Sequence, residues 1–131
     1  MRVLALDYGS ARCGVAVSDP SETIATPLEP VLAPGTRRGL GRLRELVGEW
    51  EARSVVVGLP LSLSGADTDQ TRETREFAQR LQRRLGPDVA VILHDERFTT
   101  RLAQREPHGR ASEDSRAAAH LLDSWLAARP R

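Results

Sequence analysis

Three short apolar runs constrain the fold of this chain more than any other feature of its sequence. They cover residues 3–6, 54–59 and 89–93, and the second and third are preceded by longer, more polar stretches. A strand that is apolar at successive positions has both faces covered, as in a sheet with helices packed against it. Because helices that connect such strands act as crossovers, we expect parallel pairing and an α/β fold.

The segments between and after the runs have the spacing of amphipathic helices. Apolar residues recur every three or four positions over 36–51 and 67–85, and a last helix is expected over 112–128. Two weaker signals complete the order. Pro27 and Pro30 interrupt a segment that predicts only a short strand near a sheet edge. A threonine at 99 or 100 can cap a short helix that ends by residue 107.

The N-terminal run is followed by Asp7 and then by a second run of small and branched residues at 13–17. This pattern predicts a hairpin, and hence a mixed central sheet in which antiparallel strands come first and parallel strands follow. Asp7 would lie where the first strand leaves the core, a place where a carboxylate is costly to bury without a cation or hydrogen bonds. An Asx turn that merely caps the loop is the alternative.

Composition limits the remaining possibilities. The chain has 131 residues, which fits a single domain spanning 1–131, and its formal net charge is +1. All 19 basic residues are arginine, whose planar guanidinium suits phosphate, although compositional bias explains the same excess. Cys13 lies in an apolar run and is expected in the core. Since no signal peptide or membrane-length apolar run is found, we expect a cytoplasmic protein.

Acidic residues follow two of the predicted strands. Asp7 ends the first, and Asp95 and Glu96 end the run at 89–93. Ligands of open α/β sheets bind beyond the carboxyl ends of the strands, so these acids are expected to converge. Converging carboxylates raise one another's pKa unless a divalent cation neutralises them, and oxygen-only ligands suit Mg²⁺ or Mn²⁺. A solvated loop is the alternative for Asp95 and Glu96.

The last helix offers a third carboxylate. Asp114 continues the apolar stripe of the helix toward its start, whereas Glu113 is turned about 100° away and Asp123 lies on the flank. Capping by Ser112 with an acid that complements the helix dipole explains an acidic first turn equally well. It does not explain an acid on the inward face, so Asp114 is the preferred candidate.

A serine-rich loop before the helix at 67–85 is a candidate anion site, because the first amides of a helix attract anions. Plain helix capping is the more common role of such serines. The candidate substrate-binding residues in this region are Ser62, Ser64, Thr68, Arg72 and Arg75.

Four stretches together resemble the YqgF family, also called RuvX. They are LDYGSARCGVAVSD, VVGLPLSLSG, DERFTT and an Asp-x-x-Ala-Ala pattern that begins at Asp114, and they occur in the family's order. The resemblance implies an RNase H-like three-layer fold and a bacterial nuclease that processes the 5′ end of pre-16S rRNA. Asp7, Glu96 and Asp114 fall on the family's acidic positions, which implies catalytic roles and two-metal chemistry with Mg²⁺ or Mn²⁺. Arg12 and Arg97 would hold the flanking phosphates.

Three other functions stay open at this point. A Holliday junction resolvase acting on branched DNA would use the same acids but would need two active sites, and therefore a homodimer rather than a monomer. An actin-like kinase also begins with an Asp-x-Gly hairpin, but it needs a second domain for which 131 residues leave no room. A catalytically silent nucleic-acid-binding module is less favoured, because non-specific binding relies on a basic surface and the net charge is near zero.

Overall fold

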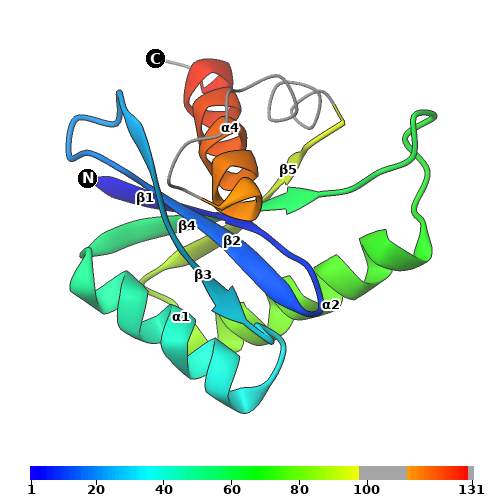
Figure 1. Cartoon of the computed structure of the whole chain (residues 1–131), viewed down its shortest axis with the longest axis horizontal. Helices are drawn as coiled ribbons and strands as arrows, with labels where there is room; N and C mark the ends of the chain where they lie inside the picture. The colour runs from blue at the N-terminus through cyan, green and yellow to red at the C-terminus, as the bar shows by residue number, and fades with distance from the viewer. Residues whose placement is uncertain (98–111, 130–131) are drawn as a thin grey trace.

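The computed structural model describes residues 1–97 and 112–129 and forms one five-stranded sheet with helices on both faces (Figure 1). The strands lie in the order β3-β2-β1-β4-β5. The elements are β1 (Arg2–Asp7), β2 (Arg12–Ser18), β3 (Ala25–Leu32), α1 (Arg37–Glu49), β4 (Ala52–Leu59), α2 (Asp69–Leu85), β5 (Ala90–Asp95) and α4 (Glu113–Ala128).

The sheet is mixed, as the sequence predicts. β1 pairs antiparallel with β2 and parallel with β4, and β5 continues the parallel half. β1 is therefore the central strand, and its residues Val3 to Leu6 are almost fully buried. A crossover helix precedes β4 and another precedes β5, because only a long connection can return the chain to the same end of the sheet.

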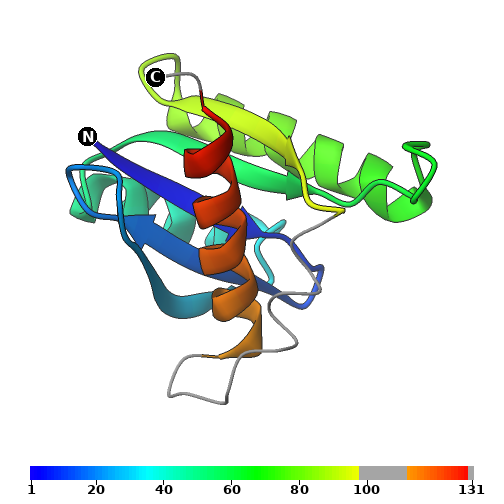
Figure 2. The same ribbon diagram turned by 90° about the horizontal axis from the view of Figure 1, so that it is seen from above.

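Two apolar clusters hold the three layers together, one on each face of the sheet. Leu4, Leu6 and Val57 point toward α1 and α2, where Phe77 and Leu81 complete the cluster. On the other face, Ala5 and Val56 pack against Ala118, Leu121 and Leu122 of α4. Figure 1 shows α1 and α2 on one side of the sheet and α4 on the other, and Figure 2 shows α4 lying across the strands. The predicted α/β fold class is confirmed.

The strand predictions need two corrections. β3 lies at a sheet edge as expected, but it is a strand of eight residues rather than a short one. Pro27 and Pro30 are tolerated there because an edge strand donates hydrogen bonds to one neighbour only. β2 and β3 remain paired on both sides of a shift in register between Cys13 and Val15.

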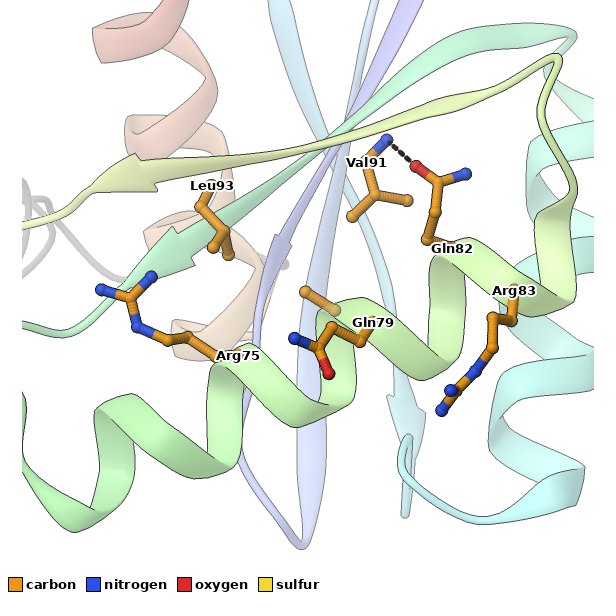
Figure 3. Close-up of a pocket in the computed structure, with 7 residues that line it drawn as sticks. Arg75, Gln79, Gln82, Arg83, Val91 and Leu93 are labelled. Atoms are coloured by element: carbon orange, nitrogen blue, oxygen red, sulfur yellow. Dashed lines mark hydrogen bonds between the residues drawn. The ribbon is translucent and has the colours of Figure 1, made fainter.

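The second correction concerns β5, whose apolar sequence predicts a strand covered on both faces. It lies at the other edge, and Leu93 remains 37% exposed. Gln82 of α2 covers part of the open edge. Its side chain accepts a hydrogen bond from Val91 N at 2.9 Å (Figure 3) and also donates one to Val89 O at 2.8 Å. A side-chain amide thus replaces a neighbouring strand over the first half of β5.

The helix predictions agree with the structure to within three residues at each end. Thr36, Thr68 and Ser112 are the N-caps of α1, α2 and α4. Cys13 is fully buried, as expected. The short helix expected between 99 and 107 lies outside the described residues. No described helix combines the length and apolar character needed to cross a membrane.

Candidate active site

Asp7 and Glu96 meet at the carboxyl end of the parallel strands. Asp7 is the last residue of β1, and Glu96 directly follows β5. The amide of Glu96 donates a hydrogen bond to Leu59 O at 3.3 Å, which fixes the residue against the end of β4. The two side chains share a hydrogen bond although β4 lies between their strands.

Burial makes this pair of carboxyl groups weakly acidic. The pKa of Asp7 is raised from 3.8 to about 6: desolvation and then the nearby charge of Asp114 raise it, while the hydrogen bond with Glu96 lowers it in part. Desolvation and the charge of Asp7 raise the pKa of Glu96 to about 7. The hydrogen bond between the two side chains lowers the pKa of Asp7 and raises that of Glu96.

Asp114 reaches the same place from α4, which packs on the face of the sheet that carries Ala5 and Val56. It lies in the first turn of α4, and its Oδ2 is 3.7 Å from Nε of Arg12, the first residue of β2. Its charge acts on Asp7, whereas Glu113 and Asp123 are exposed on other faces of α4. The structure therefore brings Asp7, Glu96 and Asp114 together, with Arg12 at their border.

Two residues that the sequence reasoning missed allow α4 to approach so closely. Gly14 is the partner of Asp7 in the hairpin, and a Cβ built on it would lie 1.9 Å from the carbonyl oxygen of Asp114. The shift in register at this glycine leaves Val15 N free to donate to Ser115 Oγ at 3.2 Å. Ser115 is fully buried and ties the first turn of α4 to β2.

Gly58 serves the same purpose for Glu96. A Cβ at this position would lie 2.4 Å from Glu96 Oε2, 3.0 Å from its Cδ and 3.1 Å from Cδ2 of Leu121. Because real Cβ atoms do not approach so closely, any side chain at 58 must displace the carboxylate, α4 or both. The sequence marks the Gly-Leu-Pro turn after β4 as the end of a strand. That Gly58 leaves space for the Glu96 carboxylate depends on contacts that the sequence does not reveal.

The Gly58→Ala variant is therefore expected to lose both activity and stability. Displacing Glu96 should slow cleavage by about tenfold to a hundredfold, and overpacking should lower the free energy of unfolding by about 1–3 kcal/mol. Cleavage rate and melting temperature measure the two effects. Gly48→Ala is the matched control, since nothing lies within 4 Å of a Cβ there. It should leave the rate unchanged and stabilise α1 by about 0.5–1 kcal/mol. A wild-type rate in Gly58→Ala would contradict this role.

A pocket of about 400 Å³ lies beside the acids and adds further residues that were missed. Asp114 and Arg12 line it together with Tyr8, Gln70 and Glu73. Tyr8 Oη donates to Glu73 Oε1 at 3.4 Å, and the Tyr8 ring stacks on Phe77 with a centroid distance of 4.4 Å. Burial and the charge of Glu73 raise the pKa of Tyr8, so the hydroxyl stays protonated and can donate a hydrogen bond. An isolated tyrosine after Asp7 gave no sequence signal beyond a turn residue.

The predicted anion loop after β4 is engaged in local contacts. Ser62 Oγ and Ser64 Oγ lie 2.9 Å apart, and Ser62 Oγ also accepts from Ala66 N. Thr68 forms a capping box with Thr71. Arg72 pairs with Asp69, and Arg75 donates two hydrogen bonds of 3.2 Å to Asp67. A role of Ser62, Ser64, Thr68, Arg72 and Arg75 in substrate binding stays a prediction.

Arg97 has a strong local partner as well. Its Nε donates to Asp95 Oδ2 at 2.7 Å, and its amide donates to Asp95 Oδ1 at 3.0 Å. This partner lowers the pKa of Asp95. Nη1 of Arg97 also donates to Leu63 O at 3.3 Å, so the arginine links the end of β5 to the loop after β4. Its predicted role in holding a phosphate remains open.

The donor chemistry of the site fits a hard divalent cation. Three carboxyl groups converge, and unrelieved charge and burial raise the pKa of two of them, which is the situation that a bound cation corrects. Within residues 1–97 and 112–129, however, no three such side chains are already arranged as a ligand set. The side chains of Asp7 and Glu96 are hydrogen-bonded to each other, and Asp114 lies beside Arg12, so cation binding would require these contacts to rearrange.

A mixed five-stranded sheet in this order, with helices on both faces, is an RNase H-like fold. Among solved structures, Thermus thermophilus RuvC in complex with a Holliday junction substrate matches with a TM-score of 0.55 and 16% identity, covering 98% of this chain and 95% of that one. A second structure of the same RuvC matches with a TM-score of 0.50. At these identities the likeness shows the fold alone.

Sequence comparison gives the family. The chain belongs to the RuvX family, whose profile, described as "Holliday junction resolvase", matches residues 1–128. A relative from Sulfurihydrogenibium sp. is 36% identical over 95% of this chain and 89% of its own length. One from Mycobacterium tuberculosis is 43% identical over 95% of this chain and 78% of its own length. Both have "pre-16S rRNA nuclease" in their names. The chain is therefore a member of a nuclease family, as its motifs predict.

Proposed function

We propose that this protein hydrolyses phosphodiester bonds in the 5′ extension of pre-16S rRNA, with Mg²⁺ or Mn²⁺ as cofactor. The observation that carries the proposal is the electrostatic contact of Asp7, Glu96 and Asp114 at one end of the sheet. The names of the relatives supply the choice of substrate. Processing of this RNA would place the protein in the cytoplasm.

Each residue of the site has a role that its position supports. Asp7, Glu96 and Asp114 would hold the cation, which supplies Lewis-acid polarisation of the phosphate and activation of water. Arg12 lies beside Asp114 at the border of the adjoining pocket, where its guanidinium can donate to a phosphate oxygen. The Tyr8 hydroxyl in the same pocket would donate to the substrate backbone in place of Glu73.

Resolution of branched DNA is the second candidate, because the family profile carries that description. A four-way junction needs two incisions, so this function would require a homodimer with both sites engaged. Among the described residues, nothing favours a dimer over a monomer. We therefore rank RNA processing first.

Initial rates on matched substrates decide between the two functions. A pre-16S precursor fragment, single-stranded DNA and a four-way junction should each be incubated with Mg²⁺, with Mn²⁺ and with a chelator. The expected result is metal-dependent cleavage that is at least about tenfold faster on the precursor RNA than on the junction. Faster, symmetric incision of the junction by a stable dimer would reverse the ranking.

A further inference from the structure

A hollow of about 670 Å³ lies between α1 and α2, outside the candidate active site. Four arginines and one glutamate line it together with a glycine: Arg37, Arg38, Gly41, Arg42, Glu45 and Arg84. We call this hollow the arginine groove. Its lining has a clear excess of positive charge although the whole chain is close to neutral.

Local ion pairs neutralise only one of the four guanidinium groups. Arg42 Nη1 donates to Glu45 Oε2 at 3.0 Å and to Glu49 Oε1 at 3.1 Å. Arg37, Arg38 and Arg84 make no ion pair with any carboxylate of residues 1–97 and 112–129. Three positive charges therefore face one hollow without compensation from the described part of the chain.

This arrangement opposes the stability of α1. Arg37 and Arg38 occupy its first turn, where the helix dipole favours acids, and that turn contains no acidic residue. Arg84 reaches across from α2 and lies over Gly41, where a Cβ would be 3.3 Å from its Nη2. A glycine inside a helix lowers helix stability. The arginines of the groove therefore lower the stability of α1. An anionic ligand that neutralises their charge would explain why they are gathered there.

Arg80 lies near Tyr8, which lines the pocket beside the acids. Tyr8 follows Asp7, and Gly35, just before α1, lies between Tyr8 and Arg80: a Cβ on Gly35 would be 3.6 Å from Tyr8 Oη and 3.7 Å from Arg80 Nη1. Arg80 is one turn before Arg84 on the same face of α2. Arg80 thus places a further guanidinium group near Tyr8, on the side of α2 that carries Arg84.

We propose that the arginine groove binds the sugar–phosphate backbone of the nucleic-acid substrate at phosphates remote from the cleaved bond. Guanidinium groups bind phosphate oxygens in pairs, and such contacts orient a substrate without reading its sequence. This role rests on the proposed nuclease function. The proposal has a specific consequence: only a substrate long enough to extend past Tyr8 can bind in the groove.

Binding of labelled RNA by an Asp7→Asn protein tests this role, since binding is then measured without cleavage. Arg38→Gln/Arg84→Gln removes two groove charges, and Arg53→Gln/Arg83→Gln is the control with the same loss of charge. Both control residues are exposed, and neither lines the groove (Arg83 appears in Figure 3). Each protein is titrated with a long hairpin RNA carrying a 5′ extension, with DNA of the same sequence and with a short RNA around the cleaved bond.

The groove variant should bind the long RNA about tenfold more weakly at about 0.1 M salt, and its slope of log K against log salt should fall by about 1.5–2. Binding of the short RNA should not change, and the control should alter neither. Equal losses in both variants, or equal losses on long and short RNA, would overturn the proposal. The DNA titration shows whether the groove distinguishes the two backbones.

Cleavage by the otherwise wild-type proteins separates this proposal from the nuclease function. If the wild type cuts no RNA but the groove variant still loses long-RNA binding, the nuclease function fails and the groove proposal stands. If the wild type cuts RNA, and the groove variant binds long RNA as well as the control variant does, the groove proposal alone fails.

Discussion

Asp7→Asn is expected to lower the rate of RNA cleavage by about three orders of magnitude or more, because the central carboxylate of the site is lost while its shape remains. The same variant should be more stable than the wild type when no metal is present. Its gain in the free energy of unfolding at pH 8 should be about 1–3 kcal/mol. Initial rates in Mn²⁺ and thermal melts in chelator measure the two effects.

The predicted pH dependence of stability follows from the raised pKa values of the two acids. In the folded protein the pKa values of Asp7 and Glu96 are raised to about 6 and about 7, from 3.8 and 4.5. Each raised pKa gives stability that is fully present below the ordinary value and is lost as the pH rises through the folded value. The metal-free wild type should therefore melt lower at pH 8 than at pH 5.

Asn cannot titrate, so the advantage of Asp7→Asn should grow over this pH range. Asp88→Asn is the control, because Asp88 is exposed at the other end of β5. It should change neither the rate nor the pH dependence. A well-folded Asp7→Asn protein that cleaves at the wild-type rate would exclude Asp7 from the chemistry.

The second large effect is expected at the start of α4. Asp114→Ala should reduce cleavage by about two to three orders of magnitude, whereas Glu113→Ala and Asp123→Ala should retain nearly full activity. Only Asp114 is beside Arg12 and acts on Asp7. Losing its favourable position near the helix start should cost about 0.5–1 kcal/mol of stability. Parallel rates and melts of the three variants make the comparison.

A different ranking of these three variants would have a clear meaning. If Glu113→Ala lost activity and Asp114→Ala lost only stability, the first turn of α4 would be rotated by one residue in the active protein. The contact of Gly14 with the Asp114 carbonyl would then also be absent, because the helix start could not sit in the same place.

The sequence predicted the layers and the strand order of the hairpin because those follow from local patterns. The runs that form β1 and β4 are apolar on both faces, and they are buried as the pattern requires. β5 has the same kind of sequence but lies at an edge. Position within a sheet depends on the other strands, and here β5 stays partly exposed, with Gln82 bonded to the backbone at its start.

The acids of the site were predictable, but the residues that let them meet were not. Asp114 could be chosen over Glu113 because the apolar stripe of the last helix fixes which side faces the sheet. Gly14, Gly58 and Ser115 matter through contacts with residues about a hundred, about forty and about a hundred positions away, respectively. In sequence they resemble ordinary strand glycines and a helix-cap serine. Their importance becomes visible only when the structure shows α4 and Glu96 in contact with them.

Cleavage of the pre-16S precursor in chelator, followed by stepwise addition of Mn²⁺, tests the central claim most directly. We expect no cleavage by the wild type in chelator and a saturable recovery of its cleavage rate as Mn²⁺ is added. Asp7→Asn should show no such recovery. Cleavage at full rate in chelator would contradict the claim that Asp7, Glu96 and Asp114 act by holding a divalent cation.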